Sequence, residues 1–320
     1  MADLTACLGR LRLKNPVMPA SGTFCCFEDN PGAIDPGSLG AVVTKTVTLV
    51  PRPGNPPPRL LETACGLLNT VGLPSPGIGA FLSEELPRLR MIGTALIVSI
   101  AGERMREYAE LAVRLGQERG VAALELNLSC PNVEKGLNFS SDARMLAQVV
   151  TAVRRETTLP VIAKLSPNVA SIVEMARTAA DAGADAVSAV NTFQGMAVDV
   201  LKRRPVFHNI HGGLSGPAIK PLALKAVWDI YRGTSIPIIG MGGISTPDDA
   251  LEFLLAGASA VAIGTANFFN PLTMAQVIEG IQDYLEEGGF ASLGDITGLA
   301  HDDFGGGGDT HRVRHEDKCR

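Results

Sequence analysis

The segment Leu124-Glu125-Leu126-Asn127-Leu128-Ser129-Cys130-Pro131-Asn132 decides the fold that we expect. Its first half alternates apolar and polar residues behind two alanines, which predicts a short strand that ends at Asn127. Pro131 has no N–H to donate and cannot continue a central strand. Cys130 therefore falls on the loop that leaves the carboxyl end of a strand, where parallel α/β proteins carry their chemistry. Taken alone, such a cysteine is more often a small buried apolar residue.

Short apolar runs of this kind recur through the chain. We expect eight of them to be strands, at residues 17–20, 41–45, 95–100, 122–127, 161–165, 186–190, 236–240 and 260–264. Most are separated by segments with helical spacing, at residues 103–118, 141–156, 169–182, 217–231, 246–255 and 271–287. Eight strands that alternate with helices predict a (β/α)8 TIM barrel. A doubly wound open sheet is the alternative, but such a sheet gathers its ligand residues at one switch point, whereas polar residues here end many strands.

Three segments lie outside this alternation. Residues 4–14 predict a short N-terminal β-hairpin, because leucines are interleaved with polar residues around a turn at Gly9. Residues 48–76 are rich in proline and cannot form a simple helix, so we expect an extended insertion that covers the active site. Residues 301–320 hold four consecutive glycines followed by mixed charges, which predicts a disordered C-terminal tail after a single domain at residues 1–300.

The composition narrows the class of protein. The 320 residues are 46% hydrophobic and 19% charged and carry a net charge of −5, so we expect no nucleic-acid partner. No apolar run approaches about eighteen residues and the N-terminus lacks a signal pattern, so we expect a soluble cytoplasmic protein without a membrane partner. The six cysteines include no C-x-x-C pair, so we predict no metal site.

Two lysines end predicted strands. Lys45 closes the second strand and Lys164 the fifth. A lysine buried at a strand end is costly unless a partner compensates its charge, although a single one is usually a snorkelling side chain. Because all strand ends of a barrel meet at one mouth, two such lysines predict an anionic ligand.

Glycine-rich turns follow the last two predicted strands. They are Gly240-Met241-Gly242-Gly243 and Gly264-Thr265. In (β/α)8 enzymes, backbone N–H groups after these strands commonly bind phosphate. Isolated glycines also serve tight turns, but in this order, with Lys164 upstream, they predict a site for a phosphorylated cofactor.

Three motifs carry a resemblance to a known family. They are Asn-Leu-Ser-Cys-Pro-Asn at 127–132, His-Gly-Gly-Leu-Ser-Gly-Pro-Ala-Ile-Lys at 211–220 and Ile-Gly-Met-Gly-Gly-Ile at 239–244. Together they resemble the dihydroorotate dehydrogenase family, over about residues 4–299. The second motif and the loop 132–139 resemble type 1B, the NAD-linked catalytic subunit, and the cysteine at position 130 separates type 1 from type 2.

The resemblance implies an enzyme that contains FMN and oxidises (S)-dihydroorotate to orotate in de novo pyrimidine (UMP) biosynthesis. It assigns Cys130 as the catalytic base that removes the C5 proton, while hydride leaves C6 for flavin N5. A cysteine suits this task because its thiol ionises closer to neutral pH than an unassisted hydroxyl does, and the thiolate accepts a proton. The implied substrate-binding residues are Lys45, Asn69, Thr70, Val71, Gly72, Leu73, Asn127, Asn132, Asn191 and Thr192. The implied FMN-binding residues are Ser21, Gly22, Lys45, Thr46, Ser99, Asn127, Lys164, Val190, Gly216, Gly242, Gly243, Gly264 and Thr265.

The resemblance to type 1B also implies a partner. Electrons would pass to NAD+ through an electron-transfer subunit that carries FAD and a 2Fe-2S cluster, in a heterotetramer of two catalytic and two electron-transfer subunits. This chain lacks the cysteine spacing for a cluster of its own. Three alternatives remain open: a dihydropyrimidine dehydrogenase-like enzyme, which usually has histidine where this chain has Asn132; a fumarate-linked type 1A enzyme; and a non-catalytic flavin-binding subunit.

Overall fold

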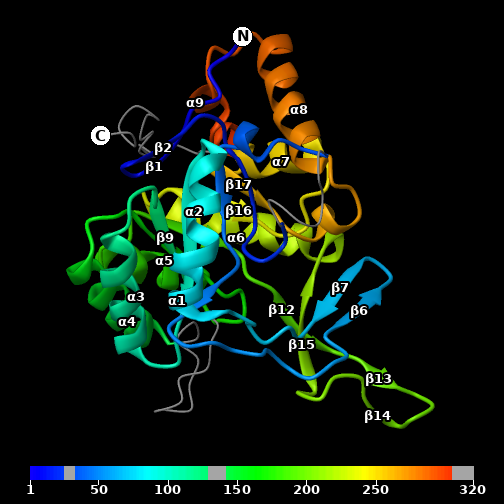
Figure 1. Ribbon diagram of the computed structural model, residues 1–320. Coiled ribbons are helices and arrows are strands. Elements are labelled where there is room, and N and C mark those ends of the chain that lie inside the picture. The colour runs from blue at the N-terminus through cyan, green and yellow to red at the C-terminus, as the bar shows by residue number, and fades with distance from the viewer. Residues whose placement is uncertain (25–32, 129–141, 305–320) are drawn as a thin grey trace.

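The computed structural model describes residues 1–24, 33–128 and 142–304 and arranges them around a barrel (Figure 1). Parallel strands form the wall of the barrel: β3 (Val17–Pro19), β4 (Ala41–Val43), β8 (Ala95–Ala101), β9 (Ala123–Asn127), β10 (Val161–Lys164), β11 (Ala186–Ala189), β16 (Ile238–Met241) and β17 (Ala260–Ile263). Their order around the wall is β3-β17-β16-β11-β10-β9-β8-β4. The two strands at the ends of this order also pack together, and Gly40 N donates to Val17 O at 2.9 Å. The predicted TIM barrel is confirmed.

The barrel strands are short and almost completely buried. Every residue of β9, β10, β11, β16 and β17 is buried. Helices cover the outside of a parallel barrel and side chains fill its inside, so these strands show continuous apolar runs more than alternation. Glu125, Asn127 and Lys164 are polar exceptions within the wall.

Long helices cover the outside of the barrel and match the predicted ones: α3 (Met105–Gly116), α4 (Ala143–Glu156), α5 (Ile172–Asp181), α6 (Lys220–Gly233), α7 (Pro247–Leu255) and α8 (Thr273–Glu287). The start of α7 is a capping box, in which Thr246 Oγ1 accepts from Asp249 N at 3.2 Å and Asp249 accepts from Thr246 N at 3.0 Å. Shorter helical turns complete the chain: η1 (Pro36–Ser38), α1 (Gly77–Ala80), η2 (Phe81–Glu85), α2 (Leu86–Leu89), η3 (Arg90–Ile92), η4 (Pro217–Ile219), η5 (Thr265–Phe268), α9 (Leu293–Ile296) and η6 (Leu299–Phe304). In the described part of the chain, no helix combines the length and apolar character needed to cross a membrane.

The predicted N-terminal hairpin closes the amino ends of the barrel strands. It consists of β1 (Ala6–Leu8) and β2 (Leu11–Leu13), which pair antiparallel and pack near β17. The leucines at 8, 11 and 13 are buried. At the turn between the strands, Arg10 Nε donates to Asp185 Oδ1 at 3.1 Å, one residue before β11 begins. Apolar side chains of the hairpin therefore cover the amino end of the barrel, and the ion pair between Arg10 and Asp185 links the hairpin to the barrel.

A second sheet stands at the other end of the barrel, away from β1 and β2 in Figure 1. Its order is β12-β15-β7-β6 and all its pairings are antiparallel: β6 (Leu60–Thr63), β7 (Gly66–Asn69), β12 (Phe193–Met196) and β15 (His211–Ser215). The predicted proline-rich insertion supplies β6 and β7, and a long connection after β11, which the sequence analysis did not predict, supplies β12 and β15. That connection also carries a small hairpin of β13 (Val198–Asp199) and β14 (Arg204–Pro205), and β5 (Val47–Thr48) pairs with β8.

The described structure continues past residue 300 through η6. There the His301 ring stacks on Trp228 with a centroid separation of 3.5 Å, so at least the first residue of the predicted tail packs on α6. Residues 305–320 of that tail lie outside the described residues.

Candidate active site

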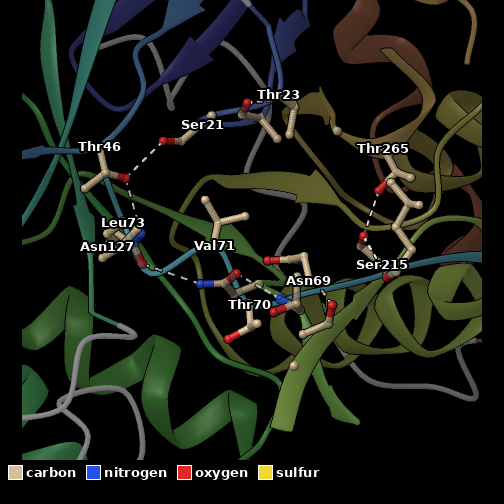
Figure 2. A pocket seen from close by; sticks show the side chains of 18 of the residues that line it. Ser21, Thr23, Thr46, Asn69, Thr70, Val71, Leu73, Asn127, Ser215 and Thr265 are labelled. Carbon is tan, nitrogen blue, oxygen red and sulfur yellow. Dashed lines mark hydrogen bonds between the residues drawn. The ribbon is translucent and has the colours of Figure 1, made fainter. Parts of the chain in front are cut away.

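A cavity of about 800 Å³ opens at the carboxyl ends of the barrel strands, beside the second sheet (Figure 2). Many predicted site residues line it: Ser21, Gly22, Lys45, Thr46, Asn69, Thr70, Val71, Gly72, Leu73, Asn127, Lys164, Val190, Asn191, Thr192, Gly216, Gly242, Gly243, Gly264 and Thr265. These residues come from the ends of most barrel strands and from the proline-rich insertion. The structure thus brings groups that are far apart in the sequence into one cavity.

Three predicted site residues remain: two lie outside the described residues, and one is described and buried. Cys130 and Asn132 lie outside the described residues, although the described chain runs through the cavity residue Asn127 to Leu128. Ser99 is completely buried and does not line the cavity. Its Oγ lies 3.1 Å from Thr46 Oγ1, so Ser99 supports the lining through Thr46.

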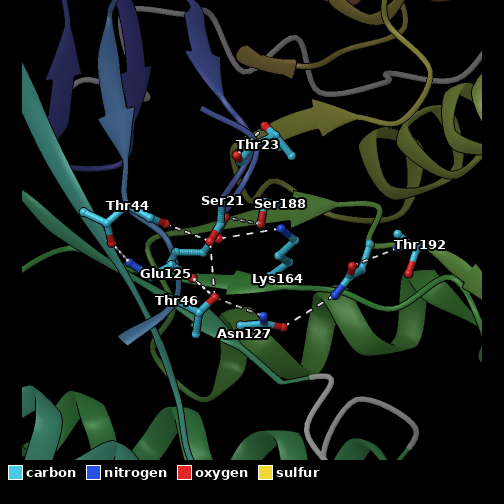
Figure 3. Close-up of polar contacts among 12 residues, drawn as sticks. Ser21, Thr23, Thr44, Thr46, Glu125, Asn127, Lys164, Ser188 and Thr192 are labelled. Carbon is cyan, nitrogen blue, oxygen red and sulfur yellow. Dashed lines mark hydrogen bonds and ion pairs between the residues drawn. The ribbon is translucent and has the colours of Figure 1, made fainter. Parts of the chain in front are cut away.

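A chain of hydroxyl and amide groups crosses the cavity floor (Figure 3). Thr46 Oγ1 lies 3.2 Å from Ser21 Oγ and accepts from Asn127 Nδ2 at 3.3 Å. Asn127 Oδ1 accepts from Asn191 Nδ2 at 3.5 Å, and Asn191 Oδ1 accepts from Thr192 N at 2.8 Å. Because each amide is held from two sides, Asn127 and Asn191 occupy defined positions in the lining.

Lys164, which lines the cavity, forms a buried ion pair with Glu125. Its Nζ lies 3.8 Å from Glu125 Oε1, and the two side chains are only 7% and 3% exposed. Ser188 Oγ donates to Glu125 Oε2 at 3.0 Å, whereas Oε1 accepts no hydrogen bond from the described residues. A buried ammonium is costly without compensation, and Glu125 supplies the opposite charge without using up the hydrogen bonds that Lys164 can donate. Among the described residues, Lys164 is therefore held near Glu125 with donors left for a ligand.

Lys45 is the second lysine that lines the cavity. Its side chain is exposed and lines the same cavity as that of Lys164. Two ammonium groups at one mouth make the cavity attractive to an anion. The arrangement agrees with the anionic ligand expected from the two strand-end lysines.

Glycine turns line another part of the cavity. Gly216, Gly242 and Gly243 have φ angles of +93°, +127° and +82°, a region that residues with a Cβ rarely adopt. Gly264 and Thr265 follow β17, and Thr265 Oγ1 donates to Ser215 Oγ at 2.8 Å. Bare backbone at such turns lets a phosphate approach N–H groups closely. The phosphate site predicted after the last two barrel strands thus has the required residues in one place.

The insertion contributes a wall through residues 69–73. Asn69 Nδ2 donates to Gly213 O at 3.0 Å, which ties β7 to β15. Asn55 Nδ2 donates to Thr70 O at 2.9 Å, and a Cβ on Gly72 would lie 2.5 Å from the Asn55 side chain. The wall is therefore packed too closely for a side chain at position 72.

Sequence reasoning missed several lining residues. Asn168 Nδ2 donates to Thr192 O at 3.0 Å, and Asn168 Oδ1 accepts from Gln194 N at 2.9 Å, so this amide links the β10 loop to the start of β12. Asn168 could have been predicted from its position, because it lies four residues after Lys164, in the loop that leaves the carboxyl end of a barrel strand. Other unpredicted lining residues include Thr23, Arg52, Asn55, Leu60, Leu67, Ser166, Gln194, Asn209, His211, Gly212, Gly213, Ser215 and Phe268. Several of them lie on or beside the second sheet, which the sequence did not reveal.

Together these features define a class of protein. A (β/α)8 barrel that gathers two lysines, several amides and glycine turns at its carboxyl end is typical of enzymes that bind anionic ligands there. A comparison with protein families makes this specific, because the dihydroorotate dehydrogenase family model matches residues 4–285. The chain belongs to the dihydroorotate dehydrogenase family. The resemblance seen in the three motifs is confirmed, and so is the prediction of an oxidoreductase.

Curated relatives cover nearly the whole chain. Proteins named dihydroorotate dehydrogenase B (NAD(+)), catalytic subunit, are similar to it in several organisms. The relative from Desulforamulus reducens is 50% identical over 93% of this chain and 99% of its own length. The relative from Desulforudis audaxviator is 53% identical over 91% of this chain and 95% of its own length. The relative from Pelobacter propionicus is 51% identical over 92% of this chain and 98% of its own length.

Proposed function

We propose that this chain is the catalytic subunit of an NAD+-linked dihydroorotate dehydrogenase, which oxidises (S)-dihydroorotate to orotate with FMN as the hydride acceptor. The observation that carries the proposal is that Lys45, Lys164, the floor amides and the glycine turns all line one cavity. Family membership and the names of the relatives support the substrate and the link to NAD+.

The cavity fits FMN in size and in chemistry. Its volume of about 800 Å³ lies in the range of cofactor sites. The glycine turns at 216, 242–243 and 264 would hold the phosphate, and Ser21, Gly22, Thr46 and Val190 would contact the rest of the cofactor. Bound FMN supplies a hydride acceptor, and the ammonium of Lys164 would stabilise the negative charge of its reduced form.

The amides of the cavity suit a pyrimidine. Asn69, Asn127 and Asn191 line the cavity together, and an amide side chain both donates and accepts. Each of them therefore complements a ring carbonyl or a ring N–H of dihydroorotate. Lys45 provides the charge that the carboxylate requires, and residues 70–73, Thr192 and Asn132 complete the proposed substrate site, with Asn132 outside the described residues.

Cys130 is the proposed base. Its thiolate accepts the proton from C5 while hydride leaves C6, and the C5–C6 double bond of orotate forms between the two carbons. Cys130 follows Leu128 by two residues and lies outside the described part of the chain. Its role rests on the motif in which it stands and on the cavity position of Asn127, three residues earlier.

We further propose a partner subunit that carries FAD and a 2Fe-2S cluster and passes electrons to NAD+, in a heterotetramer of two copies of each chain in the cytoplasm. The words "catalytic subunit" in the names of the relatives support a partner. Purification from the native source, followed by identification of each bound cofactor and chain, tests this assembly. A homodimer that is reoxidised by fumarate without a second subunit would contradict it.

Anaerobic addition of dihydroorotate to the purified protein tests the reaction itself. The yellow flavin absorbance should bleach, and orotate should appear in an amount equal to the flavin reduced. Retention of the colour would favour a flavin-binding subunit without activity. Bleaching by dihydrouracil but not by dihydroorotate would favour a dihydropyrimidine dehydrogenase-like enzyme.

A further inference from the structure

The phosphate cradle, defined as Gly216 together with Gly242 and Gly243, is assembled from two separate loops. Gly216 precedes η4 and α6, whereas Gly242 and Gly243 follow β16. The loops are in direct contact, because a Cβ on Gly243 would lie 2.9 Å from Gly216 O and 2.8 Å from Lys220 N. The spacing of the N–H groups on the two loops therefore depends on what holds α6 against the β16 loop.

Lys220, the first residue of α6, supplies such a link. Its Nζ donates to Asp249 Oδ1 at 2.7 Å and to Glu252 Oε1 at 2.8 Å, both on α7. Asp249 Oδ2 accepts from Ser245 N and Ser245 Oγ, each at 2.9 Å. One carboxylate thus connects Lys220 to the end of the β16 loop. The ion pair therefore joins the two loops of the cradle through residues that do not line the cavity.

The environment of this pair makes it stronger than an ordinary surface ion pair. The Lys220 and Asp249 side chains are 25% and 14% exposed, so water screens them only in part. Hydrogen bonds to Asp249 and Glu252 raise the pKa of Lys220. Burial acts to raise the pKa of Asp249, but its bonds from Lys220 and Ser245 outweigh burial and hold that pKa below its ordinary value. Both groups therefore stay charged around neutral pH.

We propose that Lys220, through Asp249 and Glu252, is a positioning residue that keeps the two loops of the phosphate cradle at the separation required by one phosphate group. Lys220 does not itself line the cavity, so it acts on the phosphate only through the backbone of Gly216, Gly242 and Gly243. The proposal rests on the proposed binding of FMN and adds a determinant of its phosphate specificity.

The test compares FMN with riboflavin, which lacks the phosphate. Full-length protein freed of flavin is titrated with each compound, and quenching of flavin fluorescence gives the two dissociation constants. Wild-type protein should bind FMN more tightly than riboflavin. Lys220→Met should lower this preference about tenfold or more, as expected when a charge-assisted contact is lost, with little change for riboflavin. Lys220→Arg, which can still donate to both carboxylates, should retain most of the preference.

Lys225→Met is the matched control. Lys225 lies on the same helix and pairs with Asp229, but its side chain is 72% exposed and it does not line the cavity. It should leave both affinities unchanged. If Lys220→Met does not fold, Glu252→Gln carries the test, because it removes the negative charge of one partner while keeping an acceptor oxygen, and the weaker contact with Lys220 should lower the preference for FMN by a smaller factor.

The possible results separate this inference from the proposed function. Equal weakening of FMN and riboflavin by Lys220→Met, or an unchanged preference for FMN, overturns the positioning role alone. Wild-type protein without any preference for FMN contradicts the proposed cofactor and, with it, the positioning role.

Discussion

The two ends of the barrel differ in how completely one carboxylate at each end is hydrogen-bonded by the described residues. At the amino end, Asp185 accepts hydrogen bonds from Arg10 Nε at 3.1 Å, Arg154 Nη1 at 3.0 Å and Val161 N at 2.8 Å. At the carboxyl end, Glu125 Oε1 accepts no hydrogen bond from the described residues, and Lys164 lies 3.8 Å from it. Asp185 thus accepts three hydrogen bonds, whereas Glu125 leaves Lys164 with donors that no described residue uses.

This difference indicates that the amino end of the barrel contributes mainly to stability and the carboxyl end mainly to function. A polar group whose hydrogen bonds are all made within the protein adds to the stability of the fold. A buried polar group that lacks some of its hydrogen bonds destabilises the fold, and a bound ligand that supplies them removes this destabilisation. At the amino end, the buried leucines of β1 and β2 and the hydrogen bonds of Asp185 hold the hairpin against the barrel, so this end contributes to stability. The cavity lined by Lys164, Asn127 and the glycine turns makes the carboxyl end a binding site. Substitutions at the two ends should therefore affect different measurements.

The largest expected effect is at the carboxyl end. Cys130→Ala should slow flavin reduction by dihydroorotate by about a hundredfold or more, the usual contribution of a general base, while FMN stays bound. Stopped-flow absorbance under anaerobic conditions measures the rate. Cys65→Ala, which changes an exposed free cysteine, is the matched control. Reduction of Cys130→Ala at the wild-type rate would remove Cys130 from the proposed role.

A core substitution at the amino end should affect stability instead. Leu8→Ala removes a completely buried side chain from β1 and should destabilise the fold by about 3 kcal/mol, through lost transfer energy and a cavity. The shift in melting temperature measures this effect, and Leu222→Ala, at a leucine that is 52% exposed, is the control. FMN affinity of the folded Leu8→Ala protein should match that of the wild type. A large loss of affinity would contradict the separation of the two ends.

Removal of the buried cation should affect the flavin. Lys164→Ala should weaken FMN binding by about tenfold or more, since a contact to a charged group is lost, and should make the flavin harder to reduce. Fluorescence titration and the midpoint potential measure these two effects. Lys225→Ala serves as the control. Full FMN occupancy with an unchanged potential would show that Lys164 does not contact the cofactor.

The smallest expected effect is the pH dependence of stability that arises from His301, a residue that does not line the cavity. Burial lowers the pKa of His301 below 6.5, so the folded protein favours the neutral ring that stacks on Trp228. The resulting stabilisation is present above the pKa of the unfolded chain and is lost as the pH falls through the lower pKa of the folded state. Thermal unfolding of wild type and His301→Phe across this range should show the smaller pH dependence in the variant. Equal pH dependence would contradict this account of His301.

Much of the barrel was predictable because its signals are local. Each strand is a short buried run, and each long helix shows an amphipathic pattern, so their order and type follow from nearby residues. The glycine turns and strand-end lysines could be assigned to one mouth because parallel strands in a barrel share their carboxyl end. The motifs then specified the family, which geometry alone does not do.

The second sheet was not predictable in the same way. Its central pairing joins Gly66–Asn69 to His211–Ser215, segments separated by more than a hundred residues, and no local pattern encodes such a register. The contribution of Asn168 to the cavity depends on that sheet, because Asn168 Oδ1 accepts from Gln194 N on β12. The surroundings of Ser99 were not predictable either: its side chain is completely buried, and its Oγ lies 3.1 Å from Thr46 Oγ1.

The sequence by itself determined the alternation of strands and helices, the family and most of the groups available for chemistry, since these depend on residue type and spacing. Only the tertiary structure decided which side chains share the cavity, that Glu125 lies 3.8 Å from Lys164, and that Lys220 joins the two loops of the phosphate cradle. The physical reason is that hydrogen bonds, ion pairs and van der Waals contacts act over a few ångströms, and distances in space between residues far apart in the chain are set by packing.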